Sequence, residues 1–180
     1  MRNVPATTTG AGSVVSLDDA VDHVRGTAGR LVLEYGDYEC PYARAAYRAM
    51  QRVERVMGDE VRFAYRHFPL TQIHPHALAA AAAAEAAALQ GRFWEMSDLL
   101  FAQPKGLEDR GLRAYAARLG LDLASFDADR RSAAVRARIA RDVASGLESR
   151  QVHGTPTLFV DGVLHDGDYD VESLLEVLYA

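Results

Sequence analysis

The feature that most restricts the fold of this chain is a strand–helix–strand pattern in its first half. Residues 31–35 form a short, mostly apolar run between two glycines, which is typical of a buried strand. Pro41 is well placed to begin a helix, because apolar residues recur after it at spacings of four and three until Gly58. Residues 61–68 are rich in aromatic side chains and predict a second strand, which Pro69 ends. Since a helix joins the two strands, we expect them to be parallel, with a right-handed crossover.

A run of helices is expected next. Helical patterns begin at Pro75 and continue through the alanine run, and others cover the ranges 95–101, 109–119, 122–127 and 135–149. In the last range, apolar residues repeat every four positions, which is typical of core packing, at Val135, Ile139, Val143 and Leu147.

The two ends of the chain carry shorter signals. Asp161 and Gly162 form a two-residue hairpin turn between strands expected at 157–160 and 163–165, and a helix with apolar residues from 171 to 178 closes the chain. Residues 16–19 resemble the start of a short helix that Gly26 would close. An irregular arm packed on the sheet is an equal alternative for that segment.

Length and composition fit one globular domain. The chain has 180 residues, of which 49% are hydrophobic and 25% charged, a balance that argues against disorder. Its formal net charge of −5 offers no footprint for nucleic acid or an anionic membrane surface. No stretch approaches the ~20 apolar residues of a membrane span, and residues 1–13 lack the apolar centre of a secretory signal, so we expect a cytoplasmic protein. Residues 1–13 are expected to be a flexible tail, and residues 14–180 a single α/β domain with a helical insertion at about 71–149.

Cys40 is the only cysteine of the chain, so no internal disulfide and no metal cage of several cysteines can form. It lies between the first predicted strand and the helix that begins at Pro41. The free N–H groups and the dipole of a helix N-terminus favour the thiolate, which is the nucleophilic form of cysteine. The position therefore predicts a reactive residue, and the alternative is a buried cysteine that packs as a small hydrophobe.

A second signal lies near the C-terminus, where Pro156 stands directly before a predicted strand. X-Pro bonds at tight turns of this kind are where cis peptides occur. Taken with Cys40, three stretches resemble the thioredoxin superfamily, and in particular its DsbA branch: residues 33–42 (LEYGDYECPY), 66–70 (RHFPL) and 154–157 (GTPT). The resemblance runs from about Asp22 to the C-terminus, with the helical insertion where that branch has one. It implies a thioredoxin-like α/β fold.

The resemblance also implies roles for individual residues. In this family a cis-proline loop packs against the cysteine and binds substrate backbone, which implies that Pro156 is cis and that Thr155 faces the sulfur of Cys40. Glu34, six residues before Cys40, matches a partly buried acid that relays protons, and burial should raise its pKa; an exposed strand carboxylate is the alternative. His153 lies on the same loop and as a cation would stabilise the thiolate; a histidine that points to solvent is the alternative.

The sequence departs from the family at one position of its motif. The family pattern is Cys-x-x-Cys, whereas here Cys40 is followed by Pro41, Tyr42 and Ala43. Without the second thiol, a mixed disulfide with a substrate persists until an outside thiol attacks it. We therefore expect a single-cysteine thiol–disulfide oxidoreductase that exchanges or isomerises disulfides with protein thiols or a low-molecular-weight thiol, and that uses no cofactor.

Two other functions stay open at this point. The same branch includes kappa-type glutathione transferases and related isomerases, which bind a small thiol, although their nucleophilic position is usually a serine. The fold can also serve as a redox-inactive module that holds an extended peptide. Metal binding is not expected, because His74 and His76, two residues apart around a proline, fit neither a helical metal site nor a zinc finger.

Overall fold

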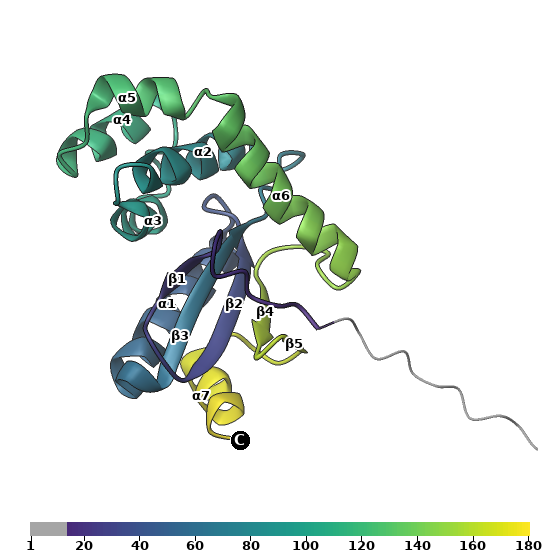
Figure 1. Cartoon of the computed structure of the whole chain (residues 1–180). Coiled ribbons are helices and arrows are strands. Elements are labelled where there is room, and N and C mark those ends of the chain that lie inside the picture. Colours follow the sequence, from purple (N-terminus) through teal and green to yellow (C-terminus); the bar gives the residue numbers. More distant parts are fainter. Residues whose placement is uncertain (1–13) are drawn as a thin grey trace, which may run out of the picture.

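The computed structural model describes residues 14–180, and the tail predicted for residues 1–13 lies outside them. In the described part of the chain, five strands form one sheet in the order β1-β3-β2-β4-β5 (Figure 1). The strands are β1 (His23–Arg25), β2 (Arg30–Gly36), β3 (Val61–His67), β4 (Thr157–Val160) and β5 (Val163–His165). The sheet is mixed: β2 and β3 are parallel, and the other neighbouring pairs are antiparallel.

The predicted strand–helix–strand unit is confirmed. Helix α1 (Pro41–Met57) joins the parallel strands β2 and β3. Pro41 occupies the first helical position, where its missing N–H costs nothing. Gly58 follows the helix with a φ of 56°, a left-handed conformation that glycine adopts freely. The predicted hairpin of β4 and β5 is confirmed as well.

The helices fall into two groups. Helix α7 (Val171–Tyr179) packs beside α1, and both belong to the core on one face of the sheet. Figure 1 shows α2 to α5 gathered beyond one end of the sheet, with α6 leading back towards β4. Their bounds are α2 (Ala77–Ala88), α3 (Phe93–Ala102), α4 (Asp109–Arg118), α5 (Leu123–Asp129) and α6 (Ala133–Ser149). No helix among the described residues is both long and apolar enough to cross a membrane.

Two expectations from the sequence need correction. The helix expected over residues 16–26 is wrong: the segment bends, and its last residues form β1, which pairs antiparallel with the edge of β3. The irregular arm was the better alternative. In α6, Val135 and Ile139 are buried as the four-residue spacing predicts, but Leu147 is 60% exposed. The buried face at the end of α6 is formed by Asp142, Gly146 and Ser149, and a spacing of four drifts away from that face because a helix has about 3.6 residues per turn.

The sheet separates two apolar clusters. Val32 of β2 packs with α1 residues such as Met50 on one face, whereas Leu33 and Tyr35 pack in the cluster on the other face. Because successive side chains of a strand point to opposite faces, Glu34 points to the same face as Val32. An acidic residue therefore lies under α1, the helix that Cys40 precedes.

Candidate active site

Cys40 lies between β2 and α1 as predicted, and it is the residue that caps the N-terminus of α1. Its sulfur lies 3.3 Å from the carbonyl oxygen of Thr155. The peptide bond between Thr155 and Pro156 is cis. The structure therefore brings together the two segments, 115 residues apart, that the sequence singled out. Cys40 is only 3% exposed.

Two features of the backbone act on the sulfur of Cys40 in opposite directions. The first N–H groups of α1 carry a partial positive charge, which favours a thiolate beside them. The Thr155 carbonyl oxygen can only accept a hydrogen bond, so it favours the protonated thiol, which donates to it. No hydrogen bond from the first turn of α1 reaches the Cys40 side chain within the described residues. The structure thus shows the contact that suits the resting thiol.

The three residues after Cys40 differ strongly in exposure. Tyr42 is 64% exposed, while Ala43 is completely buried. Ala43 occupies the position where the family pattern has its second cysteine, and its methyl group packs in the core cluster that contains Cys40. A resolving thiol is therefore absent from the place where the fold would position one.

Glu34 is buried more completely than the sequence suggested. Its side chain is fully enclosed, and neither carboxylate oxygen has a hydrogen-bond partner among the described residues. Burial raises the pKa of Glu34 to about 8, because an ionised carboxylate is costly to hold away from water. At neutral pH the group is mainly a carboxylic acid, which can donate a proton.

The predicted loop residues line a groove beside Cys40. A cavity of about 310 Å³ is bounded by His153, Thr155, Pro156, His165 and Tyr169, among others. His153 is exposed at this groove, whereas Cys40 is buried, so the alternative of a solvent-facing histidine describes it better. The cis-proline loop therefore forms one wall of this groove.

Sequence reasoning missed Asp37, which holds the segment before Cys40 in place. One of its oxygens accepts from the backbone N–H of Glu39 at 2.8 Å. The other accepts from the backbone N–H of Leu70 at 2.9 Å and lies 2.8 Å from Nδ1 of His74. The sequence around Asp37 contains only part of the information: an aspartate after a glycine is common in turns, which predicts a turn here. The partners of Asp37 in the loop after β3 could not be predicted from this local pattern. His74 is thus a partner of this aspartate.

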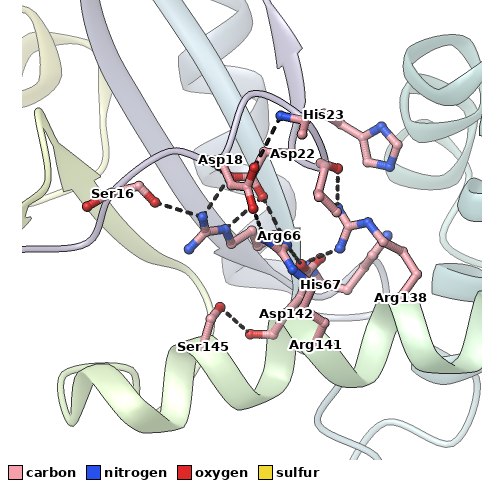
Figure 2. Close-up of polar contacts among 12 residues, drawn as sticks. Ser16, Asp18, Asp22, His23, Arg66, His67, Arg138, Arg141, Asp142 and Ser145 are labelled. Carbon is pink, nitrogen blue, oxygen red and sulfur yellow. Dashed lines mark hydrogen bonds and ion pairs between the residues drawn. The ribbon is translucent and has the colours of Figure 1, made fainter.

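A second buried network joins β3 to the N-terminal arm and to the helices (Figure 2). Arg66 donates to both carboxylate oxygens of Asp22, at 2.9 and 2.6 Å, and to the hydroxyl of Tyr35. Burial would raise the pKa of Asp22, but the hydrogen bond from Arg66 and neighbouring positive charges hold it below its usual value. The backbone N–H of His67 donates to Asp142 of α6 at 2.9 Å. These contacts fix the end of β3 that faces the Asp37 loop.

Glu85 of α2 joins two histidines in the same region. Nε2 of His67 and Nε2 of His23 each lie 2.8 Å from the same oxygen of Glu85. Burial would raise the pKa of Glu85, but the two hydrogen bonds and the charges of the histidines hold it well below its usual value. At neutral pH Glu85 is thus ionised, whereas Glu34, on the face of β2 that α1 covers, is mainly protonated.

Comparison with known proteins places these features in a family. A family model described as thioredoxin matches residues 21–180. A thioredoxin-like oxidoreductase from Silicibacter pomeroyi DSS-3 is 28% identical with a TM-score of 0.78, and the match covers 89% of this chain and 92% of that chain. Wolbachia pipientis alpha-DsbA1 is 18% identical with a TM-score of 0.76, over 92% of each chain.

A second group of relatives consists of proteins named Na(+)/H(+) antiporters. The Na(+)/H(+) antiporter NhaA 3 from Salinispora tropica is 50% identical over 167 residues, which make up 89% of this chain and 25% of the antiporter. This chain spans about a quarter of the length of the curated relatives it matches. The family match and the structural likenesses show that the chain belongs to the thioredoxin superfamily and has the DsbA-like form of its fold.

Proposed function

We propose that this protein is a thiol–disulfide oxidoreductase that acts through the single thiol of Cys40. One observation carries the proposal: the Cys40 sulfur lies at the start of α1 and 3.3 Å from the cis-proline loop, and the second motif position is Ala43. This arrangement favours attack on a disulfide presented along the groove. It lacks the second thiol that would release the product from within the chain.

The proposed reaction has two steps. The Cys40 thiolate attacks one sulfur of a substrate disulfide, so that a mixed disulfide forms and the other substrate sulfur leaves as a thiolate. A second thiolate, from the substrate itself or from a low-molecular-weight thiol, then attacks the substrate sulfur of the mixed disulfide. Cys40 leaves as a thiolate and takes up a proton. If the substrate supplies both thiolates, the result is isomerisation without net oxidation or reduction.

Glu34 is proposed to exchange the proton of Cys40. Its place under α1, its complete burial and its protonated state at neutral pH support this role. As a buried acid it can give its proton to the sulfur when Cys40 leaves the mixed disulfide, and the carboxylate that this leaves can take the proton of the Cys40 thiol when the next thiolate is formed.

The Thr155–Pro156 loop is proposed to hold the backbone of the substrate. An extended peptide in the groove can form strand-like hydrogen bonds with the loop, as in other modes of strand addition. Proteins with reactive thiols or mispaired disulfides are then the expected substrates. DsbA-named proteins with the same fold support this substrate class.

The test is intact-mass spectrometry of the protein after incubation with oxidised glutathione. We expect one glutathione adduct on the wild type, none on Cys40→Ser, and persistence of the adduct until a thiol reductant is added. An unmodified wild-type protein would contradict the proposal. Reversible binding of reduced glutathione without an adduct would favour the transferase-like alternative, and full biological activity of Cys40→Ser would favour a redox-inactive binding module.

A second proposal concerns the protein with which this chain acts. Its identity is 50% to a segment of an antiporter, but 28% to the thioredoxin-like oxidoreductase and 18% to alpha-DsbA1, which favours an antiporter as the partner. We propose that it works together with a Na⁺/H⁺ antiporter. The test is co-expression with the Salinispora tropica antiporter from which the matching quarter has been deleted. Co-purification in detergent is expected, and separate elution of the two proteins would contradict the proposal.

A further inference from the structure

One face of the sheet holds buried polar atoms that have no partner among the described residues. Besides Nδ1 of His67, they are the two carboxylate oxygens of Glu34 and the hydroxyl oxygen of Tyr65. Buried polar atoms are nearly always hydrogen-bonded, because an unpaired one costs the free energy of its lost hydration. Two such side chains at one place therefore indicate a role that outweighs this cost.

The backbone places the two side chains next to each other. Glu34 on β2 is paired in register with Tyr65 on β3, and both point to the face covered by α1. Gly36 shows how close they come: a Cβ atom built on it would lie 2.7 Å from the Tyr65 hydroxyl and 2.9 Å from one Glu34 oxygen. The glycine leaves room for both groups, at the end of β2 that leads to Cys40.

We propose that Tyr65 is a positioning residue for Glu34: its hydroxyl, which has no hydrogen-bond partner within residues 14–180, donates to the Glu34 carboxylate when Glu34 has given its proton to Cys40. This inference rests on the proposed function, in which Glu34 and Cys40 exchange that proton. The proton moves between an oxygen of Glu34 and the sulfur of Cys40, and Tyr65 keeps its own. Because hydrogen bonds to ions are about twice as strong as neutral ones, Tyr65 stabilises the ionised acid more than the protonated one.

Titratable groups from every neighbouring element surround this pair. They are Asp37 and Tyr38 after β2, Tyr47 on α1, His67 on β3 and Glu85 on α2. Burial, together with the negative charges of Tyr38, Glu34, Asp37 and Tyr47 when these are ionised, raises the pKa of Tyr65 well above its usual value. Tyr65 therefore keeps its proton over the whole range in which Glu34 titrates, and it can donate throughout.

The test is a carbon-13 NMR titration of the Glu34 carboxyl group, assigned by its loss in Glu34→Gln. We expect a midpoint near 8 in the wild type and a rise of about half a pH unit or more in Tyr65→Phe, which has the same shape without the donor. Tyr47→Phe is the matched control, because it removes a hydroxyl of the same aromatic cluster that donates to Asp98 instead. A Tyr65→Phe midpoint equal to that of the wild type would overturn the proposal.

Two further measurements cover the case in which Tyr65→Phe does not fold, and distinguish a failure of the Tyr65 proposal from a failure of the proposed function. If Tyr65→Phe does not fold, 3-fluorotyrosine at position 65 serves in its place: a stronger donor should lower the Glu34 midpoint, and no change would overturn the proposal. The pH profile of glutathione adduct formation at Cys40 should shift by the same amount as the NMR midpoint. A wild type without adducts would refute the thiol-exchange function, whereas the NMR titration would still decide whether Tyr65 supports Glu34.

Discussion

At the scale of single residues, the chemistry of the site depends on Ala43. It lies in the first turn of α1, three residues after Cys40, and it is completely buried. In Ala43→Cys, the introduced thiolate can attack the Cys40 sulfur of a mixed disulfide, which forms a disulfide within the chain and releases the substrate thiol. We expect the lifetime of the glutathione adduct to fall at least about tenfold, measured by intact mass after removal of excess oxidised glutathione.

The matched control for this variant is Ala45→Cys, whose side chain is exposed on the same helix. It adds a thiol to the protein but not beside Cys40, so the adduct should persist as in the wild type. Equal adduct lifetimes in Ala43→Cys and Ala45→Cys would show that position 43 is not poised to resolve the disulfide.

The sequence was informative about residues whose role depends on their own segment. Cys40 before Pro41 and Pro156 before a strand are local patterns, and the family resemblance predicted that they meet. The complete burial of Glu34 and the role of Asp37 were not predictable in this way. Asp37 binds the Leu70 N–H and His74, more than 30 residues away, and no local pattern encodes such a distant partner.

At the scale of secondary-structure elements, the N-terminal arm is held to the sheet by a buried ion pair. Arg66 of β3 and Asp22 of the arm are both buried and joined by two hydrogen bonds. Asp22→Asn removes one charge and leaves the Arg66 guanidinium buried without its counter-ion. We expect it to lower the free energy of unfolding by about 3 kcal/mol, measured by urea denaturation. Asp19→Asn, an exposed change in the same arm, should have almost no effect; equal losses in the two variants would contradict this account.

The helices and strands differed in how well they could be predicted from the sequence. Helices such as α1 and α6 contain apolar residues at regular spacings, which indicate a buried face, so the positions of these helices were predicted well. Strand β1 has only three residues, and its extended form comes from pairing with β3 rather than from its own side chains. The exposed Leu147 shows another limit: the buried face at the end of α6 consists of the small or polar residues Asp142, Gly146 and Ser149, which an apolar repeat does not reveal.

At the scale of the whole molecule, buried acids with opposite shifts set how stability depends on pH. Glu85 and Asp22 have pKa values held below their usual range, so the stability they contribute is present at neutral pH and is lost as the pH falls. Glu34 acts in the other direction. Its pKa rises from an ordinary 4.5 to about 8 on folding, so between these values the folded state holds a proton that the unfolded state has released.

Rising pH therefore favours the unfolded state through Glu34, and the whole cost is reached once the pH exceeds the folded pKa of about 8. At 1.36 kcal/mol for each unit of pKa difference, this cost is on the order of 5 kcal/mol. Glu34→Gln has no proton to lose at this position. Its free energy of unfolding, measured by urea denaturation, should therefore rise relative to that of the wild type as the pH is raised from 5 to 8. Subtracting the two curves cancels the contributions of Glu85, Asp22 and the histidines, which both proteins share. A constant difference between the two curves would mean that Glu34 ionises normally in the folded protein. The face of the sheet under α1 would then not hold a protonated acid, and the proposed proton exchange depends on that acid.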